Sequence, residues 1–148
     1  MRISIFGLGY VGAVSGACLA ELGHEVIGVD VDPFKAETIN KGESPIVEEL
    51  INELIAAQVK AGRYRGTTNA AEAVANSEMS LVCVGTPSTA SGGLETTYVE
   101  RVSRGIGAAL TGRGGYHVVV IRSTVLPGTV DEVVRPALEE ASGLRAGV

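Results

Sequence analysis

The sequence predicts an α/β fold in which helices cover both faces of a parallel sheet. Apolar runs of strand length alternate along the chain with segments whose apolar residues have helical spacing. The four-residue run Val118–Ile121 is β-branched throughout, as expected of a strand that is buried on both faces. A chain of 148 residues, 45% of them apolar, is large enough to form one domain around its own core.

The first segments follow the order strand, helix, strand, helix. They are the strand Arg2–Phe6, the helix Val11–Leu22, the strand Glu25–Val29 and the short helix Pro33–Asn40. Asp32 can accept a hydrogen bond from a backbone N–H at the start of the fourth segment, and Pro33 suits its first turn. Gly42 is expected to end this helix soon afterwards.

The middle of the chain begins with a turn at Ser44–Pro45 and an amphipathic helix over Glu48–Ala61. The apolar residues of this helix are spaced for one face: Leu50, Ile51, Leu54, Ile55 and Val59. Further segments are predicted in the order short strand Arg65–Thr67, helix Asn69–Ala75, buried strand Ser80–Val84, loop Gly85–Gly93, helix Tyr98–Leu110, strand Val118–Ile121 and helix Pro127–Ala141.

Composition and charge favour a small soluble ligand. The net charge is −5 and the chain has no basic cluster, so neither nucleic acid nor a membrane surface is an expected partner. No signal peptide or membrane-length apolar run is present, which favours the cytoplasm. Cys18 and Cys83 form no CxxC pair and have apolar neighbours, so they are expected to be small core residues rather than metal ligands.

A glycine-rich turn lies between the first predicted strand and the first predicted helix. Its sequence is GLGYVG, residues 7–12. Gly7 would allow the tight turn, Gly9 would let a pyrophosphate approach the backbone, and Gly12 would let the helix pack closely on the strand. The N–H groups and the dipole at the helix N-terminus would then bind the phosphates.

Asp30 strengthens this interpretation, because it ends the second strand eighteen residues after Gly12. A carboxylate there can accept hydrogen bonds from both hydroxyls of an adenosine ribose and would repel a 2′-phosphate, which favours NAD over NADP. Lys35 is expected near the same ribose. The alternative is that Asp30 is a solvated turn residue. Together these features predict a Rossmann-type doubly wound sheet with an NAD site.

A Rossmann sheet has the strand order 3-2-1-4-5-6, and here the sequence ends soon after the last predicted helix. We therefore expect a domain that is truncated before its sixth strand. In that case Val118–Ile121 is an exposed apolar edge, and self-association is expected.

Three further stretches resemble the UDP-glucose/GDP-mannose dehydrogenase family. They are GESPIVE at residues 42–48, CVGTPS at residues 83–88 and RSTVLPGT at residues 122–129. The family oxidises the C6 alcohol of a nucleotide sugar to a carboxylate by two successive hydride transfers to NAD. The resemblance is strongest to the branch that converts GDP-mannose to GDP-mannuronate for alginate, a bacterial polysaccharide. It implies that residues 1–148 are the NAD-binding domain, with a nucleotide sugar as substrate of the enzyme.

The resemblance also implies roles for individual residues. Tyr10 and Val11 would bind the NAD pyrophosphate through their backbone, Asp30 and Lys35 the adenosine ribose, and Thr86 and Thr124 would complete the site. Both threonines follow predicted strands, at the sheet edge where such folds bind ligands. The alternative is that each is a turn hydroxyl bonded to its own backbone. After Glu48 the sequence departs from the family, which usually continues with proline and glycine.

No catalytic residue is assigned in this chain. The family's cysteine nucleophile, lysine and asparagine belong to the central helical and C-terminal substrate domains, which are absent here. Cys18 and Cys83 lack a neighbouring base, and His24 and His117 lie at the sheet end opposite the predicted NAD site. The chain alone is therefore expected to be inactive.

Other functions stay open at this point. The chain could be a fragment of a UDP-glucose dehydrogenase, a non-catalytic NAD-sensing module or part of a hydroxyacid dehydrogenase. A pure sensor would not need the hydroxyls at Thr86, Ser123 and Thr124, and a hydroxyacid dehydrogenase would not share residues 44–48.

Overall fold

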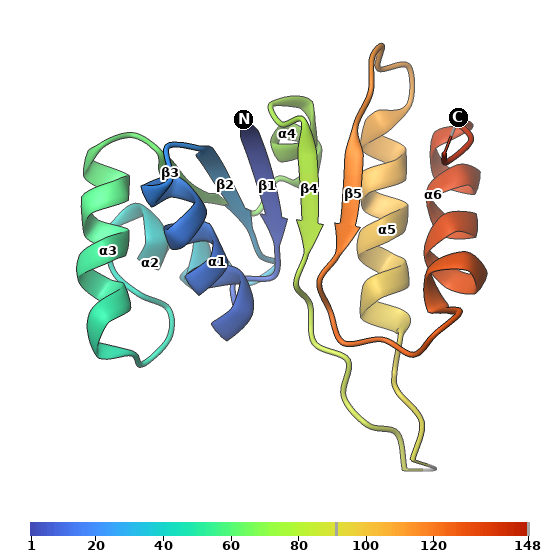
Figure 1. The fold of residues 1–148 in the computed structure, drawn as a ribbon, viewed down its shortest axis with the longest axis horizontal. Coiled ribbons are helices and arrows are strands. Elements are labelled where there is room, and N and C mark those ends of the chain that lie inside the picture. Colours follow the sequence, from blue (N-terminus) through green and yellow to red (C-terminus); the bar gives the residue numbers. More distant parts are fainter. Residues whose placement is uncertain (91, 148) are drawn as a thin grey trace.

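A computed structural model describes residues 1–90 and 92–147 and contains one sheet of five parallel strands in the order β3-β2-β1-β4-β5 (Figure 1). The strands are β1 (Arg2–Phe6), β2 (Glu25–Val29), β3 (Tyr64–Thr67), β4 (Met79–Val82) and β5 (Val118–Ile121). This confirms the predicted doubly wound sheet. The chain reverses its direction of winding between β1 and β4, and folds of this type bind ligands at that point.

Within the described residues, six α-helices connect or flank the strands. They are α1 (Tyr10–Glu21), α2 (Pro33–Asn40), α3 (Glu49–Lys60), α4 (Ala70–Ala75), α5 (Thr97–Leu110) and α6 (Arg135–Ser142), the last preceded by a π-helical turn at Val130–Val134. The predicted cap of α2 is confirmed, since Asp32 Oδ1 accepts a hydrogen bond of 3.0 Å from the N–H of Phe34. Ser91, in the predicted loop Gly85–Gly93, and Val148 lie outside the described residues.

The core has two parts, one on each face of the sheet. Neighbouring residues of a strand point to opposite faces: Ile3 and Ile5 of β1 belong to one part, and Phe6 belongs to the other. Helices α1, α2 and α3 contribute to the first part, and α4 and α5 to the second. Both faces are therefore covered, which explains the continuous apolar character of the strands.

A cluster of three serines, Ser4, Ser77 and Ser80, lies inside the second face. Each has 0% exposure. Ser4 Oγ and Ser80 Oγ are 2.8 Å apart, and Ser77 Oγ donates to Ser4 Oγ over 3.0 Å. Ser80 Oγ also lies 2.8 Å from His117 Nε2. These buried hydroxyls satisfy one another, so the serine cluster avoids the cost of unpaired polar groups.

Two predicted segments differ from the structure by more than one residue at one end, and several others by a single residue. The predicted strand Ser80–Val84 is β4 at Met79–Val82: the N–H of Cys83 still donates to the carbonyl of Phe6 over 2.7 Å, but the carbonyl of Val84 accepts from Ser123 Oγ over 2.7 Å instead of from a strand. The predicted helix Pro127–Ala141 begins only at Val130, after a turn at Gly128 with φ +91°. Pro136 cannot donate to the preceding turn, which accounts for the π-helical geometry before it.

Two side chains are more exposed than expected. Leu50 is 82% exposed, whereas Ile51 and Ile55 of the same helix are buried, so the apolar face of α3 is narrower than its sequence suggests. Cys18 is exposed on α1, so the expectation of a core residue is wrong there. Within the described part of the chain, no helix has the length and apolar character needed to cross a membrane.

Candidate functional site

All nine residues predicted to bind the cofactor lie at the carboxyl ends of the strands, the lower end of the sheet in Figure 1. They are Gly7, Gly9, Tyr10, Val11, Gly12, Asp30, Lys35, Thr86 and Thr124. Four different strand ends, those of β1, β2, β4 and β5, supply them. Parallel strands bring these ends to one edge of the sheet, which explains how positions more than a hundred residues apart share one site.

Two glycines of the turn after β1 are required by the fold. Gly7 has φ +97°, which side chains rarely adopt, and a Cβ there would lie 2.9 Å from the carbonyl oxygen of Cys83. A Cβ on Gly12 would lie 1.8 Å from the carbonyl oxygen of Gly7. Gly9 differs, because a Cβ there would meet nothing within 4 Å. The space beside Gly9 is therefore open to a ligand.

The N-terminus of α1 suits an anion. Gly9 is its N-cap and provides no side-chain hydrogen bond, and the first turn has no acidic residue. The positive end of the helix dipole therefore faces the open space beside Gly9 without a carboxylate from its own first turn. This arrangement is typical of phosphate sites.

Asp30 joins the glycine turn to the end of β2. Its carboxylate is 9% exposed, and Oδ2 accepts a hydrogen bond of 2.7 Å from the N–H of Leu8. Oδ1 accepts from the N–H of Asp32 over 3.0 Å, and Lys35 Nζ lies 3.4 Å from Oδ2. The alternative of a solvated turn residue is wrong. A carboxylate has about four acceptor positions, so capacity for ligand hydroxyls remains.

Thr86 and Thr124 also lie together. Thr86 Oγ1 donates to the backbone carbonyl of Thr124 over 2.7 Å and so ties the loop after β4 to the loop after β5. The hydroxyl of Thr86 thus bonds a neighbouring loop rather than its own turn. Its oxygen keeps lone pairs for a further hydrogen bond. Cys83 connects this side of the site to the glycine turn, since its backbone packs directly on Gly7.

Glu48 is a site residue that the sequence did not single out. Its Oε2 accepts a hydrogen bond of 3.0 Å from the hydroxyl of Tyr10, the first residue of α1. This hydrogen bond to a carboxylate raises the pKa of Tyr10. Only the family-like stretch at residues 42–48 hinted at this position.

Cys83 is not poised to act as a nucleophile. Burial raises the pKa of its thiol to about 11, despite the opposing effect of Arg122. The thiol is therefore protonated at neutral pH, whereas covalent catalysis requires the thiolate. Cys83 is therefore a poor candidate for a nucleophile.

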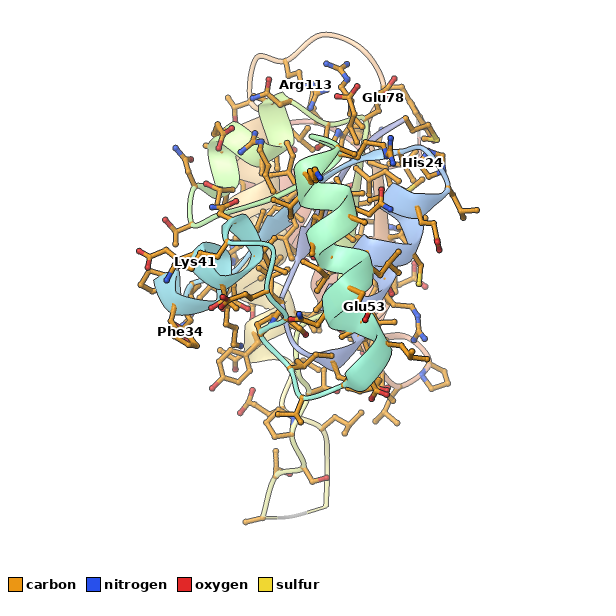
Figure 2. All side chains as sticks on the ribbon, turned by 90° about the vertical axis from the view of Figure 1, so that its left-hand side faces the viewer. His24, Phe34, Lys41, Glu53, Glu78 and Arg113 are labelled. Carbon is orange, nitrogen blue, oxygen red and sulfur yellow. The ribbon has the colours of Figure 1, made fainter. Side chains whose placement is uncertain are left out.

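The two histidines lie far from the candidate site. In Figure 2, His24, Glu78 and Arg113 gather at the end of the sheet opposite the glycine turn. His117 precedes β5 at this same end, and its Nδ1 lies 3.2 Å from Arg113 Nη1. A guanidinium only donates, so Nδ1 must accept and Nε2–H must donate to Ser80. His117 therefore has a structural, hydrogen-bonded role at this end of the sheet.

His117 gives the stability of the protein a pH dependence. Burial, with a contribution from Arg113, lowers the pKa of His117 below its usual 6.5. The unfolded chain therefore binds a proton more readily than the folded one, and the free energy of unfolding should fall as pH drops through about 6.5. Urea denaturation at about pH 8 and at about pH 5, which span the range in which histidine titrates, would measure this change. In His117→Gln the slope over this interval should be shallower; an unchanged slope would contradict the assignment.

Comparison with known proteins gives one family. Residues 1–148 match the model of the UDP-glucose/GDP-mannose dehydrogenase family, NAD binding domain. The GDP-mannose 6-dehydrogenase of Azotobacter vinelandii is 60% identical over 148 residues, which is 100% of this chain and 34% of that protein.

Solved structures agree with this match. A GDP-mannose dehydrogenase from Pseudomonas aeruginosa, solved as a ternary complex, has a TM-score of 0.98 and 54% identity over 100% of this chain and 34% of that one. A UDP-glucose dehydrogenase from Pyrobaculum islandicum has a TM-score of 0.91 and 38% identity, covering 97% of this chain and 33% of that one. The chain thus spans about a third of the length of these relatives.

Proposed function

Because the chain belongs to the UDP-glucose/GDP-mannose dehydrogenase family, as its NAD-binding domain, we propose that it supplies the cofactor site of an enzyme that oxidises GDP-mannose to GDP-mannuronate. The observation that carries the cofactor role is Asp30, whose nearly buried carboxylate is fixed beside the glycine turn by the N–H of Leu8. Bound NAD would supply the acceptor for the hydride removed from the sugar alcohol.

The residues present fit a dinucleotide. The open space at Gly9 and the N-terminus of α1 would hold the pyrophosphate, with Tyr10 and Val11 contributing backbone N–H groups. Asp30 and Lys35 would hold the adenosine ribose, and Asp30 would repel the extra phosphate of NADP. Thr86 and Thr124, on the far side of the switch point, would line the nicotinamide end.

The choice of GDP-mannose is supported by the degree of similarity. Identity is 54–60% to the two GDP-mannose dehydrogenases and 38% to the UDP-glucose dehydrogenase. In this proposal the sugar site and the catalytic cysteine belong to the two thirds of the relatives' length that this chain does not cover. Residues 1–148 would then bind NAD without turning over the sugar.

The proposal places the reaction in the cytoplasm and allows self-association. The exposed thiol of Cys18 is free, which suits a reducing compartment. Strand β5 is one of the two outer strands of the described sheet, and beside it lies a groove lined mainly by apolar residues, including Val119, Ile121 and Val134. Such an edge favours association with another polypeptide.

The proposed function is tested on the full-length protein that contains this chain. With GDP-mannose and NAD, we expect two NADH to form for each sugar oxidised. The absorbance of the reduced nicotinamide measures this ratio. UDP-glucose should react at least about tenfold more slowly in kcat/KM. Faster oxidation of UDP-glucose would reassign the substrate, and the absence of NADH formation with both sugars would contradict the proposal.

A further inference from the structure

The contact between Tyr10 and Glu48 joins the beginnings of two helices that are far apart in the sequence. Tyr10 is the first residue of α1 and Glu48 is the residue just before α3. The hydroxyl of Tyr10 donates to Glu48 Oε2 over 3.0 Å, and the Tyr10 side chain is 60% exposed. An exposed tyrosine ring without such a partner would sample several rotamers. The carboxylate of Glu48 therefore fixes the ring beside the N-terminus of α1.

The backbone that carries Glu48 is itself held in place. Ser44 N–H donates to Asn52 Oδ1 over 2.9 Å, which ties the loop to α3. Ser44 Oγ donates to the carbonyl of Ile46 over 2.8 Å and accepts from its N–H over 3.2 Å. The side chain of Ile46 packs against the core on the α1 face. Glu48 thus projects from an ordered loop that is anchored at two points.

The carboxylate of Glu48 does not cap the helix that follows it, α3. It occupies the N-cap position of α3, with φ −151° and ψ 124°, yet it makes no side-chain hydrogen bond to the first turn of that helix. An acidic side chain at this position would ordinarily be stabilised there. Its hydrogen bond goes instead to Tyr10, which belongs to the predicted phosphate site.

We propose that Glu48 is a positioning residue for the dinucleotide, which acts by holding the ring of Tyr10 as a wall of the pyrophosphate site. This inference rests on the proposed NAD site at the N-terminus of α1. In this role Glu48 acts through its hydrogen bond with Tyr10 and would make no contact of its own with the cofactor. The loop at residues 42–48 is thereby coupled to cofactor binding.

The negative charge of Glu48 and its positioning of Tyr10 should affect cofactor binding in opposite directions. A carboxylate near a pyrophosphate is repulsive, so if charge governed the effect, removal of the negative charge would tighten binding. If position governs, then loss of the acceptor weakens binding even though a like charge has been removed. Glutamine separates the two effects, because its amide oxygen can still accept from Tyr10 while the charge is gone.

The experiment is a titration of the protein with NADH, followed by the fluorescence of the reduced nicotinamide. Glu48→Ala should weaken binding about fivefold, as expected for loss of one hydrogen bond, whereas Glu48→Gln should bind as tightly as the parent protein or slightly more tightly. Tyr10→Phe should weaken binding as much as Glu48→Ala. The double variant should be no weaker than either single variant, because both remove the same interaction.

Glu53→Ala is the matched control, since Glu53 is an exposed acid on the same helix (Figure 2) and should leave NADH binding unchanged. Thermal unfolding of each variant shows whether it is folded. If Glu48→Ala binds NADH as well as the parent, or if Glu48→Ala and Glu48→Gln both tighten binding, the positioning role is overturned while the NAD site stands. A folded parent protein that does not bind NADH would overturn the proposed function and this inference together.

Discussion

Replacing Gly12 with alanine is expected to leave little folded protein. The new Cβ would lie 1.8 Å from the carbonyl oxygen of Gly7. Because this oxygen belongs to the backbone, no rotation of a side chain can relieve the clash. Relief would require α1 to move away from β1, against which the first turn of the helix is packed. The loss in the free energy of unfolding should exceed about 4 kcal/mol, which is a large part of the roughly 5–15 kcal/mol that stabilises a typical domain. Thermal denaturation followed by circular dichroism would measure it.

Gly9→Ala is the matched control in the same turn. A Cβ at Gly9 meets nothing within 4 Å, and its φ of −78° is ordinary for alanine, so the melting temperature should stay close to that of the parent. Binding of NADH should nevertheless fall by at least about thirtyfold, because the methyl group would occupy the space for the pyrophosphate. Similar melting temperatures for the two alanine variants would contradict the contact geometry of the glycine turn.

Replacing Asp30 with alanine should damage both cofactor binding and stability. The N–H of Leu8 would lose its buried acceptor, and the N–H of Asp32 would lose its partner as well. We expect a loss of about 2–4 kcal/mol in the free energy of unfolding, measured by urea denaturation. Calorimetric titration of the folded variant should show NAD binding weakened at least about thirtyfold, and discrimination against NADP should largely disappear.

Asp32→Ala controls for the loss of an acidic side chain nearby. Asp32 caps α2 through the N–H of Phe34, so its removal should cost about 1 kcal/mol in stability. Its effect on NAD binding should be small. If Asp30→Ala and Asp32→Ala weakened NAD binding equally, a general electrostatic effect rather than ribose recognition by Asp30 would explain the result.

The sequence predicts the sheet well because its strands are short apolar runs between clear helix and turn signals. The bounds of β1, β2, β5 and α2 agree with those predicted, and the cap at Asp32 is correct. These features depend on neighbours within a few residues. The end of β4 is different, because it is set by a hydrogen bond from Ser123, which is distant in sequence.

The same distinction holds for the site. Local pattern was enough to find the glycine turn and Asp30, but not the hydrogen bond from Leu8 that buries the carboxylate. Nor could spacing reveal that Tyr10 contacts Glu48, since this contact depends on how α1 and α3 pack together. The exposure of Cys18 and Leu50 likewise depends on the rotation of each helix against the sheet.

The buried hydroxyls of Ser4, Ser77 and Ser80 constrain how this domain can evolve. Each serine satisfies another, so a single change to an apolar residue leaves a buried hydroxyl with one partner fewer. Replacing all three with small apolar residues leaves no unpaired hydroxyl in the cluster, but it deprives the Nε2–H of His117 of its acceptor, so His117 has to change with them. Substitutions at these four positions are therefore expected to be epistatic, and related sequences should keep or lose the three hydroxyls and His117 together.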